Sequence, residues 1–163
     1  TGTGLLAFAA HHLWPDAKII ASDIDPIAVT VTGENAGENA IPLGNRRSQI
    51  RLVQSNGLDH PALKQRAPYD LIIANILAGP LVSLAPQIAA ASTTGTVLLL
   101  AGLLSRQKAE VVRAYVREGF RLRHSQLDNE WPSLTLVKSR KYGWRRKAHQ
   151  RKSPLAPDYF GEI

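Results

Sequence analysis

The chain opens with a glycine-rich turn, and an acidic strand end follows it about 20 residues later. The first four residues are Thr1-Gly2-Thr3-Gly4, and an apolar helix is expected directly after them. Glycine lacks a Cβ, so such a turn can come close to a ligand, while the following helix directs free N–H groups at it. A strand expected over residues 18–22 leads into Asp23. A carboxylate there can accept both hydroxyls of a ribose, so the pair predicts a nucleoside cofactor in an open α/β fold.

Two classes of cofactor fit this pair. Residues 2–7, Gly-Thr-Gly-Leu-Leu-Ala, match the dinucleotide fingerprint G-x-G-x-x-A. They also resemble the end of the G-x-G-x-G loop of S-adenosylmethionine-dependent methyltransferases. The motif is short, and glycine and threonine at a chain start can also be a frayed end. The choice between the cofactors therefore depends on the rest of the chain.

The remaining sequence alternates expected strands and helices. Helices are expected over 5–13, over 26–39 with Asp25 as N-cap, from about 81 to 94 with Leu81, Leu84, Ala85 and Ile88 on one side, and from Ser105 to Gly119 with Ala109, Val112 and Val116 on one side. Strands are expected at 18–22, 50–54, 69–74 and 96–101, followed by a hairpin of 120–127 and 133–138. Residues 59–68 are expected to form a loop that includes one helical turn. The apolar runs 69–74 and 96–101 are typical of strands buried on both faces. This order predicts a Rossmann-like α/β fold with a mostly parallel twisted sheet, helices on both faces and a C-terminal antiparallel hairpin.

Composition narrows the class of protein. The length of 163 residues suits one domain with a sizeable core. The absence of cysteine excludes disulfides, thiolate catalysis and cysteine metal sites, and the five histidines have no ligand spacing. No apolar run of about 18 residues or signal-peptide pattern occurs, so no membrane contact and a cytoplasmic location are expected.

Positive charge is concentrated at the end of the chain. Residues 138–163 hold 8 Lys and Arg against 2 Asp and Glu, which gives +6 of the total net charge of +7. We therefore expect a domain over 1–138 and a flexible basic tail over 139–163. The tail surrounds Tyr142 and Trp144, on which bases could stack, so contact with ribosomes or RNA is one hypothesis for it. A non-enzymatic RNA-binding module led by this tail is an alternative function.

Several further motifs give the sequence a resemblance to one family over about residues 1–138. It is similar to the ribosomal-protein methyltransferases, which methylate amino groups of large-subunit ribosomal protein L11. The resemblance is carried by the glycine turn, Asp23-Ile24-Asp25-Pro26, Asn35-Ala36 with Asn39, Glu130-Trp131 and, most specifically, Asn75-Ile76-Leu77-Ala78-Gly79-Pro80-Leu81. It implies a class I methyltransferase fold and S-adenosylmethionine as cofactor, with S-adenosylhomocysteine as product. It also implies N-methylation of lysine or N-terminal amino groups of a ribosomal protein.

The resemblance and the strand ends together give a set of candidate site residues. The cofactor would contact Thr1, Gly2, Thr3, Gly4, Asp23, Ile24, Asn56, Gly57 and Asn75. The Asn75 side-chain oxygen and the Ile76 carbonyl would accept N–H groups of the substrate amine and so aim its lone pair. Asn56 with Gly57 is equally well explained as a turn, and Asn75 can be read as a turn former. An NAD(P)-dependent oxidoreductase using the same glycine turn remains the alternative enzyme.

The sequence also predicts a segment before Thr1. The sheet expected from the three strands at 18–22, 69–74 and 96–101 calls for a middle strand just before the glycine turn. A gap there would leave backbone groups of the neighbouring strands unpaired, which is costly. We therefore expect an upstream apolar strand of about 4–8 residues, ending in an acidic residue and a further glycine. The resemblance implies a substrate-recognition domain further upstream.

Overall fold

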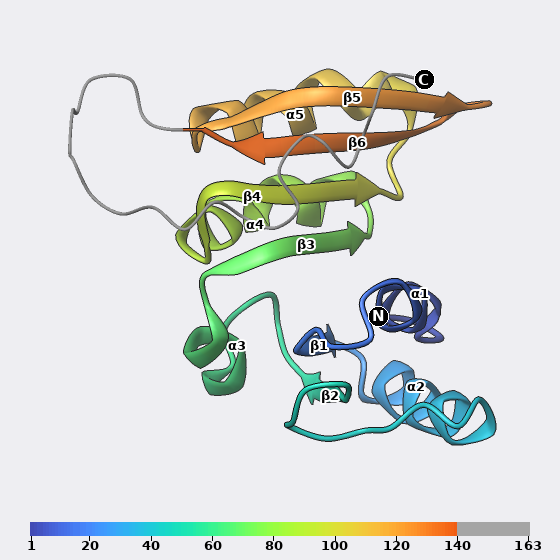
Figure 1. Cartoon of the computed structure of the whole chain (residues 1–163). Helices are drawn as coiled ribbons and strands as arrows, with labels where there is room; N and C mark the ends of the chain where they lie inside the picture. Colours follow the sequence, from blue (N-terminus) through green and yellow to red (C-terminus); the bar gives the residue numbers. More distant parts are fainter. Residues whose placement is uncertain (140–163) are drawn as a thin grey trace, which may run out of the picture. The chain divides into compact units, whose positions relative to one another are not determined.

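The computed structural model describes residues 1–139 and divides the chain into two compact units, Thr1–Arg66 and a second unit that begins at Ala67 (Figure 1). The basic tail expected over 139–163 lies outside the described residues except for Ser139. Among the described residues, the helices are all too short or too polar to cross a membrane.

The first unit joins a two-stranded parallel sheet to three helices. Its elements are α1 (Leu5–Leu13), β1 (Ile19–Asp23), α2 (Pro26–Glu38), β2 (Ile50–Gln54) and α3 (Pro61–Arg66). The strands β1 and β2 pair in register from Ile19 with Ile50 to Asp23 with Gln54. Helix α2 begins as expected, because the Asp25 carboxylate accepts the Ile27 N–H at 2.8 Å and Pro26 is the first helical residue.

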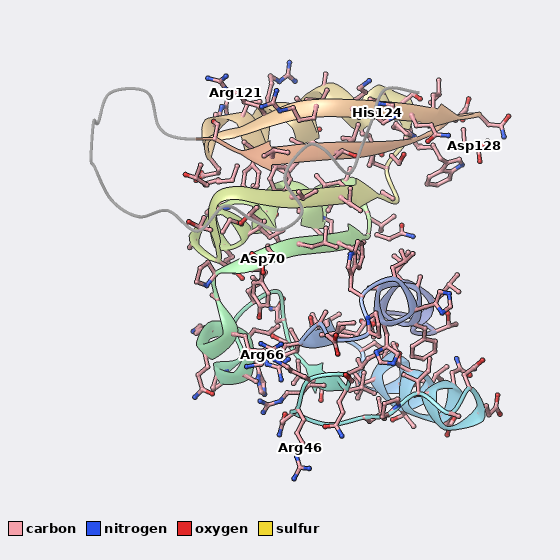
Figure 2. The ribbon with its side chains drawn as sticks, in the orientation of Figure 1. Arg46, Arg66, Asp70, Arg121, His124 and Asp128 are labelled. Atoms are coloured by element: carbon pink, nitrogen blue, oxygen red, sulfur yellow. The ribbon has the colours of Figure 1, made fainter. Side chains whose placement is uncertain are left out.

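Helix α3 is longer than the single helical turn expected within residues 59–68. The six-residue helix begins at Pro61, and the His60 ring Nδ1 accepts the Ala62 N–H at 3.1 Å, which caps its first turn. Ala62 and Leu63 are buried. At the other end, Arg66, which is labelled in Figure 2, donates to the carbonyls of Ile19 at 3.1 Å and Asn45 at 3.2 Å. Helix α3 is therefore attached to the start of β1.

The second unit is a four-stranded mixed sheet with two main helices. Its elements are β3 (Tyr69–Asn75), α4 (Ala78–Ala90), β4 (Ser92–Ala101), the 3-10 turn η1 (Ser105–Gln107), α5 (Lys108–Arg117), β5 (Phe120–Asp128) and β6 (Trp131–Lys138). The strand order is β3-β4-β6-β5, with β3 parallel to β4 and the other pairs antiparallel. Figure 1 shows α4 and α5 on one face of this sheet. The expected terminal hairpin is thus confirmed.

Three expectations about this unit were wrong in detail. Strand β3 is not buried on both faces, since Ile73 is 36% exposed. Helix α4 ends at Ala90 and not near residue 94, and β4 begins at Ser92 and not at 96. The longer strand is held by the Thr96 hydroxyl, which bonds to the Tyr69 carbonyl at 2.6 Å across a register shift.

The last helix differs from expectation in its start and in its buried face. Ser105 begins the 3-10 turn, and its hydroxyl donates to the Glu130 carbonyl at 3.2 Å and does not cap α5. The buried residues of α5 are Val111 and Tyr115, whereas Val116 is 51% exposed. The buried Tyr115 hydroxyl donates to the Leu81 carbonyl at 2.9 Å, and this bond between α5 and α4 decides which apolar face is inside.

Candidate functional site

The glycine turn of the first unit lies against the carboxyl end of β1. The Thr1 ammonium donates to Asp23 Oδ2 at 2.5 Å and to the Ser22 carbonyl at 3.1 Å. The Gly2 N–H donates to the same Asp23 oxygen at 3.0 Å, and the Asp25 N–H donates to Oδ1 at 3.1 Å. The two features that the sequence places about 20 residues apart are therefore in direct contact.

Asp23 is the most strongly perturbed acid of this unit. Burial raises the pKa of its carboxyl, but the hydrogen bonds from Gly2, the Thr1 ammonium and Asp25 lower it, as does the charge of that ammonium, so that the pKa falls from 3.8 to about 2. The side chain is 20% exposed. It is thus an ionised acceptor at neutral pH that remains accessible to solvent.

Close packing explains why the turn needs glycine at position 4. Gly4 is buried and has a φ of +91°, a left-handed conformation that costs a residue with a Cβ. An added Cβ would lie 2.5 Å from Phe8 Cζ and 2.8 Å from Thr32 Cγ2. At Gly2, with a φ of +56°, a Cβ would meet nothing within 4 Å. The turn is therefore packed on its helix side and open at Gly2.

Two side chains of α2 hold the turn, and the sequence did not give either of them a role. The Thr32 hydroxyl lies 3.0 Å from the Gly2 carbonyl oxygen, and Asn35 Nδ2 donates to the Thr3 carbonyl at 2.9 Å. The spacing of three residues puts both side chains on one helix face. That shared face was visible in the sequence, but its partner was not.

Ile24, Asn56 and Gly57 lie beside this cluster, at the carboxyl ends of β1 and β2. The Ser55 N–H donates to the Asp23 carbonyl at 2.8 Å, and the Ser55 hydroxyl donates to the Gly57 carbonyl at 3.0 Å. Gly57 has a φ of 61°, so the segment is a turn, as one of the two interpretations held. The Asn56 side chain is exposed, and no hydrogen bond joins it to any described residue. Ile24 is 63% exposed.

Asn75 and Ile76 belong to the second unit and form a separate group. Asn75 is the last residue of β3 and pairs with Ala101, and the Ile76 N–H donates to the Ala101 carbonyl at 3.3 Å. The Asn75 side chain is exposed, and within residues 1–139 no hydrogen bond holds it. Its amide is therefore available at the carboxyl edge of the sheet, where open α/β folds bind ligands.

No group of three or more His, Asp or Glu side chains that could hold a metal ion occurs among residues 1–139. The candidate residues offer a charged acceptor beside a glycine turn in one unit, and two neutral acceptors at a strand end in the other.

Solved structures define the class of fold. The chain is similar to a precorrin-6y C5,15-methyltransferase from Geobacter metallireducens, with a TM-score of 0.65 and 14% identity over 85% of this chain and 75% of that one. It is also similar to a ribosomal protein L11 methylase from Lactobacillus delbrueckii subsp. bulgaricus, with a TM-score of 0.72 and 29% identity over 85% of this chain and 67% of that one. The fold is that of the class I methyltransferases.

The family follows from the sequence comparisons. The model of the ribosomal protein L11 methyltransferase (PrmA) family matches residues 1–139. A ribosomal protein L11 methyltransferase of Mesorhizobium japonicum is 40% identical over 136 residues, which are 83% of this chain and 45% of the relative. That of Brucella abortus is 38% identical over 137 residues, 84% of this chain and 46% of the relative. The chain belongs to this family and spans about half the length of the curated relatives it matches.

Proposed function

We propose that this chain is the methyl-transferring part of an enzyme that uses S-adenosylmethionine to methylate lysine or N-terminal amino groups of ribosomal protein L11. The observation that carries the proposal is the family match over residues 1–139, which includes both groups of candidate residues. The two alternatives, an NAD(P)-dependent oxidoreductase and a non-enzymatic RNA-binding module, receive no support from the relatives.

The residues of the first unit fit a nucleoside cofactor. Asp23 is ionised and accepts N–H groups, so its carboxylate suits the two ribose hydroxyls. The open space at Gly2 lets the backbone of the turn come close to the ligand. Asn56 presents an exposed amide that suits the adenine amino group. The cofactor site would also be lined by Thr1, Thr3, Gly4, Ile24 and Gly57. S-adenosylmethionine, when bound, supplies an electrophilic methyl group on a positively charged sulfur.

The residues of the second unit would prepare the amine. The Asn75 Oδ1 atom and the Ile76 carbonyl are neutral acceptors that would each take one amine N–H, which leaves the nitrogen lone pair free and directed. A lysine amine has an ordinary pKa of about 10.4, so it must lose a proton before it reacts, and removal from water lowers its pKa. We assign no general base. Positioning and desolvation supply the rate in this proposal.

The test is methyl transfer by the full-length protein that carries this chain. Purified protein is incubated with S-adenosylmethionine labelled in its methyl group and with ribosomal protein L11, and the modified residues are located by mass spectrometry. Label on amino groups of L11, together with thermal stabilisation by S-adenosylhomocysteine and not by NAD, is the expected result. Stabilisation by NAD alone, or label on RNA and not on protein, would contradict the proposal.

A further inference from the structure

Gly102, the residue that follows β4, lies against the end of β3 and has no Cβ. Its φ is +82°, and a Cβ added there would lie 2.7 Å from the Ile76 carbonyl oxygen and 2.8 Å from Asn75 Oδ1. It would also lie 2.9 Å from the Ile76 backbone nitrogen. Real Cβ atoms essentially never come within 3.0 Å of another heavy atom. Any side chain at position 102 would therefore displace Asn75, Ile76 or the loop itself.

The atoms in contact are the two acceptors of the proposed amine site. We infer that Gly102 is a positioning residue, whose lack of a side chain lets the Asn75 amide and the Ile76 carbonyl occupy the places from which they direct the amine. The inference rests on the proposed function and extends it to a residue that the sequence analysis did not select. It lies wholly within the second unit.

The loop that carries Gly102 is held on both sides, so the strain of an added Cβ would fall on the neighbouring group that is held least. Before it, the Ala101 carbonyl accepts the Ile76 N–H. After it, Leu103 is fully buried and the Leu104 N–H donates to Gln107 Oε1 at 2.9 Å.

The same loop is also fastened to the β5–β6 hairpin. The Ser105 N–H and hydroxyl both donate to the Glu130 carbonyl, at 2.9 Å and 3.2 Å. Glu130 lies in the turn that follows Asp128, and Figure 2 shows Asp128 at that end of the hairpin. The exposed Asn75 amide, in contrast, has no hydrogen bond to any described residue. The amide is therefore the group that yields.

The chain supplies a matched control for the backbone strain. Gly119 has a φ of +87°, close to that of Gly102, but the nearest atom to its added Cβ is Lys138 Nζ at 3.9 Å. Gly102→Ala and Gly119→Ala thus place a Cβ on a similar left-handed backbone, and only the first presses on the candidate acceptors. A difference in activity between the two variants therefore reports the contact of the new Cβ with Asn75 and Ile76. It does not report the cost of a Cβ on a left-handed backbone.

The experiment compares both variants with the wild type in the full-length protein. We expect Gly102→Ala to lower kcat for L11 methylation at least about tenfold, because small misplacements of reacting groups are costly. The Kd of S-adenosylhomocysteine, measured by calorimetry, should stay within about twofold. Gly119→Ala should leave both quantities within that range. Equal kcat for the two variants would overturn the inference.

A second pair of variants keeps the inference testable if Gly102→Ala is poorly stable. Asn75→Ala removes the Oδ1 atom that lies 2.8 Å from the added Cβ. Gly102→Ala should therefore lower Tm less in the Asn75→Ala background than in the wild type, and the two losses of kcat should not add. Additive effects on both quantities would overturn the inference. Absence of L11 methylation by the wild type would instead contradict the proposed function.

Discussion

The Thr32 hydroxyl lies 3.0 Å from the carbonyl oxygen of Gly2, which is 30 positions earlier in the chain. The Thr32 hydroxyl oxygen also lies 2.9 Å from the Ala28 carbonyl oxygen, one turn back in α2. The single proton of this hydroxyl is therefore shared between two acceptors. Asn35 repeats this arrangement one turn later at Thr3. Helix α2 thus holds the carbonyls of Gly2 and Thr3, while the Gly2 N–H donates to Asp23.

This relationship can be tested with a matched pair of threonines. Thr30 makes the same kind of bond to the carbonyl four residues earlier, at 3.1 Å from Pro26, but does not touch the turn. Thr32→Val should weaken S-adenosylhomocysteine about fivefold, because one hydrogen bond is worth about 1 kcal/mol. Thr30→Val should leave the affinity unchanged. Calorimetry on the full-length variants measures both, and equal affinities would show that the turn does not need Thr32.

Asp23 should contribute most of the ribose affinity. A hydrogen bond to a charged group is worth about 1.5–3 kcal/mol, so Asp23→Ala should weaken S-adenosylhomocysteine by at least about tenfold. Asp16→Ala, which removes an exposed acid from the same unit, serves as the control. A folded Asp23→Ala variant with unchanged affinity by calorimetry would rule out the ribose role.

Asp23 also predicts a pH dependence for a chain that begins at Thr1. Its folded pKa is about 2 and lies below the unfolded value of 3.8, so its contribution is present above pH 4 and is lost as the pH falls toward 2. The loss should be about 2 kcal/mol in urea unfolding of this chain. Asp23→Asn should remove that part of the pH dependence, and acetylation of the terminal amine should reduce it. A wild type and an Asp23→Asn variant with the same slope below pH 4 would contradict the assignment.

Asn75 should act on turnover far more than on cofactor affinity. If its amide aims the amine, the interaction strengthens toward the transition state, and Asn75→Ala should lower kcat about 10- to 100-fold. The Kd of S-adenosylhomocysteine should change far less. Single-turnover kinetics on L11 with the full-length protein measure the chemical step directly. Wild-type turnover in this variant would remove Asn75 from the mechanism and, with it, the role inferred for Gly102.

The basic tail should be separable from the chemistry. Ending the chain after Arg140 removes six of the eight Lys and Arg residues at 138–163. Cofactor affinity should then be unchanged, while any binding to ribosomes should weaken and lose part of its salt dependence. Sedimentation with ribosomes at several salt concentrations tests this. A large loss of cofactor affinity would show that the tail belongs to the site.

The start of α2 was predicted correctly from the sequence, and the buried face of α5 was not. The start of α2 follows from Asp25 and Pro26, which are adjacent in the chain, and the structure confirms it. The buried face of α5 does not follow from spacing, because Val111 with Tyr115 and Val112 with Val116 are both apolar pairs four residues apart. The bond between Tyr115 and the Leu81 carbonyl decides between them, and no helical pattern contains that information.

The candidate site also has parts that the sequence indicated and parts that it did not. The sequence predicted that the glycine turn and Asp23 serve one cofactor, which stays a prediction, and the structure adds hydrogen bonds that join the two. Thr32 and Gly102 act across 30 and 27 positions of sequence, on Gly2 and Asn75, and their residue types alone gave no signal. The strand expected before Thr1 stays a prediction: among the described residues β1 pairs only with β2, and β3 only with β4.

The place of β6 in the second unit has a consequence for how the chain is made. Among the described residues, β6 is the last strand in chain order, yet it lies inside the sheet, between β4 and β5, with Val97 paired to Val137. A nascent chain therefore emerges from the ribosome with one edge of β4 exposed and unpaired until residues 131–138 follow. An open edge of this kind is a template for wrong pairing. Translation that stalls or stops before Trp131 should leave an aggregation-prone, protease-sensitive product. It should not leave a shorter domain that is folded.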